Sequence, residues 1–264
     1  MLEAKRVSQT GLVVYEQCPH QYYLRYIEGL RWPAPVSEAS RRLERAGQLG
    51  QRFHRLVEQH ALGLDVDRRA YADPDLGRWW DRFRSEPPEV PAGTVYSELT
   101  LACRLGDVLL TATFDRIVVH EDGLTIIDWK TSKHRPERDD LEKAWQTIVY
   151  LYVLAEAAAQ VSDQPWPPEA IELVYWYAEH AGTPQRIPYS SEQHAEAKTR
   201  LQSVLAHLAG TAPADYPRTD DLTICAGCLY RTYCQRDEQE AGDLDDALAG
   251  LWADDSFNED AFVR

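Results

Sequence analysis

The chain of 264 residues has little of what marks a membrane or secreted protein. No apolar run approaches the ~18 residues that are needed to span a bilayer. Residues 1–10 are polar, so they do not provide the apolar segment of a secretory leader. Cysteine is sparse, with five residues, and without a secretory context a disulfide framework is not expected. We therefore expect a cytoplasmic protein without a membrane partner, whose cysteines hold a metal or a cluster.

Positive charge is also scarce. The chain has 28 Lys and Arg against 43 Asp and Glu, and the formal net charge is −15. This speaks against binding to nucleic acid mainly by general electrostatic attraction. The acidic excess is strongest from Asp237 onward, where Arg264 is the only basic side chain. Since neither a repeat nor an interdomain linker is visible, we expect one domain over residues 1–236, followed by an acidic tail over residues 237–264.

Periodicity and turn residues predict an α/β domain. Helices are expected at residues 8–28 (two stretches joined at Cys18-Pro19), 46–62, 76–83, 139–160 and 191–208. Strands are expected at residues 95–105, 108–119, 124–131, 171–178 and 185–189. Turn signals at Gly106-Asp107 and before Gly123 make the first three strands an antiparallel meander. We expect a central sheet built on this meander and wrapped by helices from both ends of the chain.

Acidic residues of the meander are expected to share one face of the sheet. Asp128 and Lys130 are two residues apart on a strand, so their side chains point the same way. A connection with two loop residues would put Asp115 opposite Lys130, and one with four would put it opposite Asp128. The tight turn at residues 106–107 puts Glu98 directly opposite Asp115. Either register therefore gathers the carboxylates on neighbouring strands.

Such a row of carboxylates needs a partner. The β-carbons of facing residues lie ~5 Å apart, so the charges repel unless a proton or a cation neutralises them. Hard oxygen ligands of this kind favour Mg²⁺ or Mn²⁺. The alternative is an exposed sheet face on which the acids are solvated. Four apolar residues on the same face indicate that part of it is covered: Ile117, Val119, Leu124 and Ile126.

Three cysteines near the end of the chain have the spacing of a metal site. Cys225, Cys228 and Cys234 form C-x2-C-x5-C, and such a group needs a fourth ligand. Cys18 is the candidate. The spacing alone favours structural zinc over an iron–sulfur cluster. Cys103 lies within a predicted strand and is expected to be a buried small residue.

Three segments, spread over most of the chain, resemble motifs of one enzyme family. The segment TFDRIVVHEDGLTIIDWKTSK (residues 113–133) is similar to the active-site hairpin of the PD-(D/E)XK nucleases, in the branch of the RecB and AddB nuclease domains. GQRFH (residues 50–54) resembles the helical motif that brings a histidine to the metal in that branch. QTIVY (residues 146–150) resembles its QxxxY motif. The resemblance implies a restriction-endonuclease-like α/β/α core with a mixed central sheet.

The resemblance also implies a metal site. Asp115 and Asp128 would ligate Mg²⁺ or Mn²⁺, and His54 would complete the shell. Asp128 stands where many members of the family carry Glu, which the motif permits. Glu98 would be either a further ligand or a structural partner of the site.

The implied activity is metal-dependent hydrolysis of DNA, on single strands or at ends, which leaves a 5′-phosphate and a 3′-hydroxyl. Lys130 would position or activate the attacking water. Gln146 and Tyr150 would steady Lys130 or the DNA backbone. The implied pathways are DNA repair and recombination or CRISPR adaptation. The alternative is a non-catalytic iron–sulfur module that binds DNA or assembles with a helicase partner.

Iron–sulfur members of this branch carry one cysteine before the nuclease motifs and three after them. EQCPHQYYLRY (residues 16–26) and CAGCLYRTYC (residues 225–234) match that layout. A cluster held this way would tie the N-terminal helix to the C-terminal segment. Separately, the charge of the acidic tail indicates either a disordered solubilising segment or a DNA mimic. The resemblance thus implies a [4Fe-4S] cluster, with structural Zn²⁺ as the alternative, on four residues: Cys18, Cys225, Cys228 and Cys234.

Overall fold

The computed structural model describes residues 5–31, 38–212, 215–226 and 228–236. The chain divides into two compact units, which are Met1–Gln9 with Arg52–Ala209, and Thr10–Gln51 with Gly210–Arg264. We call the first the sheet unit and the second the cysteine unit. The expectation of one domain over residues 1–236 stays a prediction, and the predicted acidic tail at residues 237–264 lies outside the described residues.

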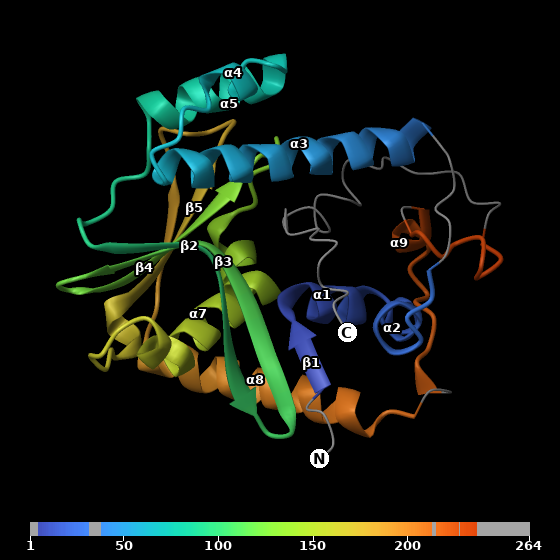
Figure 1. Cartoon of the computed structure of the whole chain (residues 1–264). Helices are drawn as coiled ribbons and strands as arrows, with labels where there is room; N and C mark the ends of the chain where they lie inside the picture. The colour runs from blue at the N-terminus through green and yellow to red at the C-terminus, as the bar shows by residue number, and fades with distance from the viewer. Residues whose placement is uncertain (1–4, 32–37, 213–214, 227, 237–264) are drawn as a thin grey trace. The chain divides into compact units, whose positions relative to one another are not determined.

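A six-stranded mixed sheet forms the centre of the sheet unit (Figure 1). The order along it is β1-β3-β4-β5-β6, and β2 pairs with β3. The β2-β3-β4 meander is antiparallel, and β5 adds to β4 in parallel. The predicted mixed sheet on an antiparallel meander is therefore confirmed. The strands are β1 (Lys5–Ser8), β2 (Thr94–Leu105), β3 (Val108–His120), β4 (Gly123–Lys130), β5 (Ile171–Tyr177) and β6 (Gln185–Pro188).

β3 has one partner strand on one edge and two partner strands on the other. β2 pairs with it along nearly its whole length. On the other edge, β1 pairs with residues 108–111 and β4 with residues 116–120. Among the described strands, none pairs with residues 112–115 on that edge, and Asp115 lies at the end of this gap. β1 is missing from the sequence prediction because its four residues, two of them basic, are too few to show alternation.

Helices flank the sheet on both sides. The predicted helix at residues 139–160 is divided, because Ala144 has extended backbone (φ −65°, ψ 140°). The predicted helix at residues 46–62 begins earlier, at Glu38, and the short α4 is not predicted at all. The elements are α3 (Glu38–Ala61), α4 (Asp67–Ala70), α5 (Pro74–Ser85), α6 (Arg138–Lys143), α7 (Trp145–Ala157) and α8 (Ser191–Gly210), with 3-10 turns η2 (Ala158–Gln160) and η3 (Pro168–Ala170).

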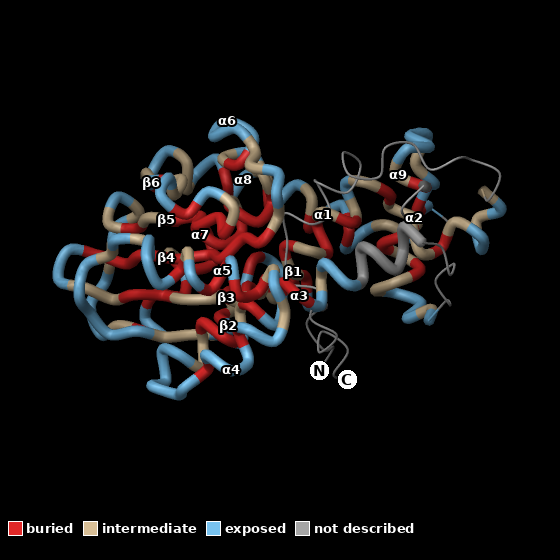
Figure 2. Tube along the Cα trace, turned by 90° about the horizontal axis from the view of Figure 1, so that it is seen from above, coloured by how far each residue is buried: buried red, intermediate tan, exposed pale blue. Residues whose placement is uncertain are grey.

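The layers are fixed by contacts on opposite faces of β4 and β5. Every residue of β4 is buried, as is typical of a strand covered on both faces. On one face, Thr147 of the largely apolar α7 lies 2.8 Å from the Tyr175 hydroxyl of β5. On the other, Phe53 of α3 stacks on Trp176 of β5, beside Phe83 of α5. The predicted α/β/α core is therefore confirmed, and buried positions run through its layers (Figure 2).

The cysteine unit joins segments from both ends of the chain. It contains α1 (Gln9–Gln17), α2 (Pro19–Tyr22), the π-helical turn η1 (Tyr23–Ile27) and α9 (Leu222–Ala226). The two helical stretches joined at Cys18-Pro19 are confirmed, with the proline in the first turn of α2. The backbone N–H of His20 donates to the carbonyl of Pro217 (3.0 Å), and the Tyr230 hydroxyl donates to the carbonyl of Leu30 (2.9 Å). Across the described residues, no helix is both long enough and apolar enough to cross a membrane.

Candidate active site and cysteine cluster

The register of β3 on β4 fixes the surroundings of Asp115. The last ladder pair joins Arg116 to Ile127, so Asp115 and Asp128 are the first residues beyond the ladder, and this register would place them opposite each other. This is one of the two registers that the sequence left open. It was expected with a loop of four residues, but the pairing extends to His120 and Gly123, so the turn has only two residues. Beyond the ladder, the backbone N–H of Trp129 donates to Oδ2 of Asp115 (2.8 Å). A side-chain carboxylate thus continues the hydrogen bonding where the strand pairing ends.

Glu98 lies opposite Asp115, as the β2–β3 register predicts. Ser97 and Leu99 pair with the residues on either side of Asp115. Glu98 itself has φ 49°, a left-handed conformation that costs a residue with a β-carbon ~1–2 kcal/mol. Backbone strain of this kind is concentrated at functional sites. The position of Glu98 was therefore predicted, but its backbone conformation was not.

Three potential metal ligands meet beside these strands. One ligand atom from each of His54, Glu98 and Asp115 lies within 4.8 Å of the others, and Nδ1 of His54 is 3.3 Å from Oδ1 of Asp115. Glu98 is exposed as a whole residue, but burial of its carboxyl end and the charge of Asp115 raise its pKa to about 7, against the influence of His54. Two carboxylates that repel each other, together with an imidazole, form a donor set for a divalent cation.

A buried ion pair lies on the neighbouring strand. Nζ of Lys130 is 2.8 Å from Oδ2 of Asp128, and both side chains are 2% exposed. Nε2 of Gln146, on α7, donates to Oδ1 of Asp128 (2.9 Å). Burial raises the pKa of Asp128 against the attraction of Lys130, and the charge of Asp115 adds to the rise. The alternative of solvated acids on an exposed face therefore does not hold for Asp128 and Lys130.

Two aromatic residues pack on the strands that flank β4. Tyr150 is buried on α7, and its ring centroid lies 4.9 Å from that of Phe114 on β3. The ring of Tyr175, on β5, lies 5.7 Å from Nζ of Lys130, and its hydroxyl is 2.8 Å from Oγ1 of Thr147. Tyr175 and Thr147 cannot be predicted as part of the site from the sequence, because β5 reaches β4 through a parallel crossover whose register no hairpin turn fixes.

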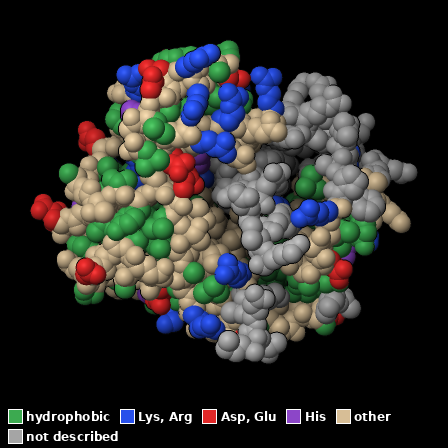
Figure 3. All heavy atoms as spheres, in the orientation of Figure 1, with side chains coloured by type: hydrophobic (Ala, Val, Ile, Leu, Met, Phe, Trp, Pro, Cys, Tyr) green, Lys and Arg blue, Asp and Glu red, His purple; other side chains and the backbone are tan. Residues whose placement is uncertain are grey.

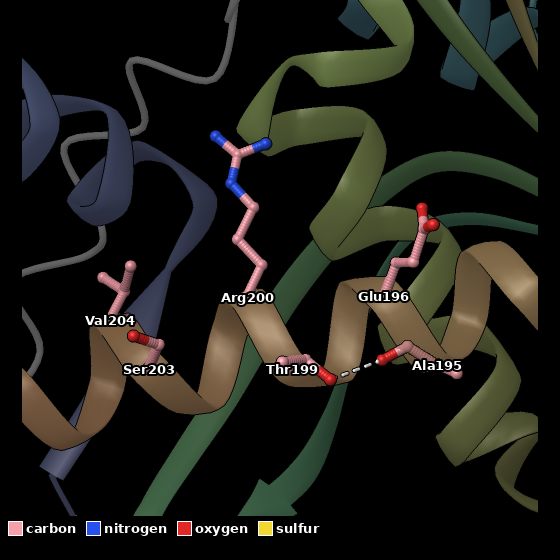
Figure 4. Close-up of a pocket in the computed structure, with 6 residues that line it drawn as sticks. All are labelled: Ala195, Glu196, Thr199, Arg200, Ser203 and Val204. Atoms are coloured by element: carbon pink, nitrogen blue, oxygen red, sulfur yellow. Dashed lines mark hydrogen bonds between the residues drawn. The ribbon is translucent and has the colours of Figure 1, made fainter.

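A cavity of about 540 Å³ lies away from these residues, along α8 (Figure 4). It includes none of the predicted site residues. Thr199 donates to the carbonyl of Ala195 on the same helix (2.9 Å). Arg200 points away from α8: its guanidinium carbon lies 4.0 Å from the Trp145 ring, and Nη1 donates to the carbonyl of Lys143 (3.0 Å). The contribution of α8 is therefore to hold the break between α6 and α7, next to Gln146.

Four of the five cysteines gather in the cysteine unit, and none of the five forms a disulfide. Burial raises the pKa of Cys228 to about 12 against a hydrogen bond from the backbone of Tyr230, and the three neighbouring thiols add to the rise. Nη1 of Arg236 lies 3.0 Å from Sγ of Cys225. Cys103 is buried in β2, as predicted. One small cavity is lined by all four members of the cluster: Cys18, Cys225, Cys228 and Cys234.

The comparisons with known proteins agree with this architecture. The sequence profile of the PD-(D/E)XK nuclease superfamily matches residues 6–90 and 69–235, which together span most of the chain. The chain therefore belongs to the PD-(D/E)XK nuclease superfamily. No curated protein sequence matches it significantly.

Two solved structures are similar over nearly the whole chain. One is a protein from Eubacterium rectale that is provisionally assigned as an exonuclease, with 12% sequence identity, a TM-score of 0.54 and 94% of each chain covered. The other is called SSO0001, with 13% identity, a TM-score of 0.42, and 89% of this chain and 87% of that one covered. At such low identity, the first structure supports the fold and nothing more.

Proposed function

We propose that the protein is a Mg²⁺- or Mn²⁺-dependent deoxyribonuclease that hydrolyses phosphodiester bonds in single-stranded DNA or at DNA ends. One observation carries the proposal: in a member of a nuclease superfamily, ligand atoms of His54, Glu98 and Asp115 lie within 4.8 Å of one another. The buried Lys130–Asp128 pair on the adjacent strand supplies the cationic donor that such a reaction needs. Membership of the superfamily leaves the metal, the substrate and the pathway open, and these are the proposed part.

The donor set is compatible with the proposed cation. Oxygen ligands and an imidazole suit Mg²⁺ and Mn²⁺. Burial and, after it, repulsion by Asp115 raise the pKa of Glu98 to about 7, and a cation would offset both effects. Asp128, which faces Asp115 in the β3–β4 register, is proposed as a further ligand. His54, Glu98, Asp115 and Asp128 then come from a helix and three adjacent strands.

The residues of the site have different roles in the proposed hydrolysis. A divalent cation held by His54, Glu98 and Asp115 would supply a water of lowered pKa and would offset charge on the phosphate. The Trp129 N–H holds the carboxylate of Asp115 in one orientation (2.8 Å). Lys130 donates hydrogen bonds beside the nucleophile and orients the attacking water. Gln146 holds Asp128 (2.9 Å), so that Lys130 keeps its position when substrate enters.

The choice of substrate and pathway rests on the resemblance of the hairpin and helical motifs to the RecB and AddB branch. Its members process DNA ends, which is the reason for proposing single strands or ends as substrate. A helicase or a CRISPR adaptation protein as partner rests on the same resemblance and stays a prediction. A cytoplasmic location rests on the polar residues 1–10 and the lack of long apolar runs, and it stays a prediction too.

We also propose that the cysteine cluster holds [4Fe-4S], with structural zinc as the alternative. Four thiols without disulfides line one cavity, and the Arg236 guanidinium borders it, which fits an anionic metal–thiolate group. Iron is preferred over zinc because the cysteines before and after the nuclease motifs match the layout of the iron–sulfur members. When bound, the cluster would tie α2 to the C-terminal segment by covalent metal–sulfur bonds.

A cleavage assay tests the nuclease proposal. The protein is purified without oxygen and incubated with labelled single-stranded DNA and Mn²⁺ or Mg²⁺. Asp115→Ala and Lys130→Ala are expected to lose activity at least about 100-fold, while Asp122→Asn on the β3–β4 turn and the exposed Lys133→Ala keep it. Equal cleavage by all five proteins would overturn the assignment. Absence of cleavage in the wild type, with DNA binding retained, would instead favour the non-catalytic module.

The cofactor is tested on the same preparation. We expect visible-range absorption and iron in proportion to protein, both lost in Cys18→Ala and retained in Cys103→Ala. A colourless protein that contains one zinc per chain would show that zinc, not iron, is bound.

A further inference from the structure

The cavity of the cysteine cluster is lined by three arginines as well as by the four thiols: Arg218, Arg231 and Arg236. Lys and Arg side chains also gather on part of the face drawn in Figure 3, although the whole chain has a net charge of −15. Four thiolates outnumber the positive charge of Zn²⁺ or of an oxidised [4Fe-4S] core, so either group would be an anion. The basic lining therefore suits a metal–thiolate group, and its members differ in what they contact.

Arg236 contacts one of the ligand sulfurs. Its Nη1 lies 3.0 Å from Sγ of Cys225 and also donates to the carbonyl of Thr219 (2.7 Å). One guanidinium nitrogen thus joins the segment before α9 to the sulfur. A thiol is a weak acceptor, whereas a thiolate that holds metal accepts a charge-assisted hydrogen bond. The contact is therefore strongest when Cys225 holds metal.

A motif that ends a helical turn fixes the position of Arg236. Gln235 has φ 58°, the left-handed conformation of such an end. Its N–H donates to the carbonyl of Thr232 (3.0 Å), and the N–H of Arg236 donates to that of Arg231 (2.9 Å). These are the two hydrogen bonds of a Schellman motif. The chain thus reverses directly after Cys234, and Arg236 returns to the cavity that Cys234 also lines.

Arg218 lines the same cavity but contacts a different kind of atom. Its Nη1 donates to the backbone carbonyl of Cys234 (3.1 Å), whereas the metal ligand of that residue is its sulfur. The sulfur of Cys228 accepts from the backbone N–H of Tyr230 (3.4 Å), which truncation of a side chain does not remove. Arg236 is therefore the donor to sulfur that a substitution can test, and Arg218 is its matched control.

We propose that Arg236 is a positioning residue of the metal site: its N–H···S hydrogen bond holds the Cys225 sulfur and draws electron density from it, so that the metal is released slowly. The inference rests on the proposed cofactor, and it applies to a [4Fe-4S] cluster and to zinc alike. Groups that hydrogen-bond to metal ligands contribute about 10–100-fold to metal affinity. Hydrogen bonds to sulfur also help to set the potential of iron–sulfur clusters.

The first test measures metal release from the full-length protein, purified without oxygen and mixed with an excess of EDTA. Iron or zinc, whichever the wild type holds, is followed with a chromogenic chelator. For Arg236→Met we expect release at least about tenfold faster than in the wild type. Arg236→Lys keeps a cationic donor and should restore most of the retention. Arg218→Met removes an arginine of the same cavity but no donor to sulfur, and it should release metal at close to the wild-type rate.

The spectrum of the bound metal separates this role from a purely structural one. A hydrogen bond to a thiolate lowers the energy of its lone pairs, so its loss shifts the thiolate-to-metal charge-transfer absorption to longer wavelength. We expect the shift in Arg236→Met and not in Arg218→Met. It is measured on the iron–sulfur spectrum or, if the protein holds zinc, after replacement of zinc by Co²⁺. With iron bound, the midpoint potential should also be lower in Arg236→Met.

The outcomes distinguish the role of Arg236 from the cofactor itself. Wild-type release and an unshifted absorption in Arg236→Met, or equal changes in Arg218→Met, would overturn the proposal while the cofactor stands. A wild type that holds neither iron nor zinc would refute the cofactor, and the role of Arg236 with it. Thermal unfolding shows whether each variant folds. If Arg236→Met does not, Arg236→Gln, which keeps a polar group but not the charge, is measured in its place by the same criteria.

Discussion

The carboxylate site of the sheet unit (His54, Glu98, Asp115, Asp128 and Lys130) and the cysteine cluster of the cysteine unit are built in opposite ways. Four of the five residues of the carboxylate site come from one continuous meander of three strands. The cysteine cluster combines Cys18 with three residues about two hundred positions later in the chain. Strand register thus sets the geometry of the carboxylate site. The cysteine cluster forms only when both ends of the chain fold together.

The two sites also differ in how their charges are balanced. Asp128 already has Lys130 and Gln146 as partners within 2.9 Å. The Cys228 thiol, in contrast, has its pKa raised to about 12 by burial, and it must lose its proton before it can bind metal. We therefore expect the sheet unit to fold before its proposed metal arrives, and the cysteine unit to gain much of its stability from the metal that we propose for it.

Removal of Cys18, a proposed metal ligand, should have the largest effect of the predicted changes. In Cys18→Ala we expect loss of the bound metal and unfolding of the cysteine unit, since structural metals contribute ~10 kcal/mol or more in small metal-dependent domains. Hydrogen–deuterium exchange should become fast in residues 10–31 and 215–236 and stay slow in β4. Cys103→Ala is the control. Full metal content in Cys18→Ala would contradict the account.

Loss of the buried lysine should have the next largest effect. Lys130→Met leaves Asp128 buried without its cation, which we expect to lower the free energy of unfolding by ~3–5 kcal/mol. The exposed Lys133→Met should change it by less than about 0.5 kcal/mol. In Asp128→Leu/Lys130→Met most of the stability should return, because both charges are gone, but DNA cleavage should not. Urea unfolding and the cleavage assay measure the two effects. An unstable double variant would contradict the attribution of the lost stability to the unpaired charge of Asp128.

Acid should weaken the sheet unit through Glu179, which follows β5. Burial alone would raise its pKa, but hydrogen bonds from Trp79, Arg78 and Arg82 lower it to about 2 from the ordinary 4.5. A carboxyl whose folded pKa is depressed stabilises the fold fully above pH 4.5 and loses this contribution as the pH falls toward 2. We expect roughly 2 kcal/mol, after screening of the partly exposed arginines. In Glu179→Gln, but not in Glu121→Gln on the exposed turn, unfolding followed by fluorescence should lose this acid dependence.

The smallest predicted effect concerns the strained residue Glu98. A glycine adopts φ 49° without steric cost, so Glu98→Gly should be more stable than Glu98→Ala by ~1 kcal/mol. Both variants should bind Mn²⁺ more weakly than the wild type. Thermal unfolding of the two variants compares them directly, and a more stable alanine variant would show that the backbone is not strained.

Much of the sheet unit could be predicted from the sequence because its signals are local. The turn at residues 106–107 fixes the register that puts Glu98 opposite Asp115, and the turn before Gly123 limits β3 and β4 to two registers. The sequence could not choose between two registers for Asp115, because each keeps the same face. It also missed the break at Ala144, since the apolar pattern continues on both sides of it.

The parts that the sequence did not reveal depend on distant contacts. β1 pairs with β3 across about a hundred residues, and its four residues have no pattern of their own. Tyr175 reaches Lys130 only through the parallel pairing of β5 with β4. The cysteine cluster was predicted as a group from its spacing, but the choice of iron over zinc rests on the resemblance and not on that spacing.

The central claim is that the carboxylates and His54 together bind a divalent cation. Calorimetric titration of the full-length protein with Mn²⁺ tests it most directly, with Asp115→Asn and His54→Ala as site variants and Asp122→Asn as the control. We expect the wild type and the control to bind Mn²⁺, and both site variants to bind it at least about tenfold more weakly. Binding of Mn²⁺ by Asp115→Asn as tight as that of the wild type would contradict it.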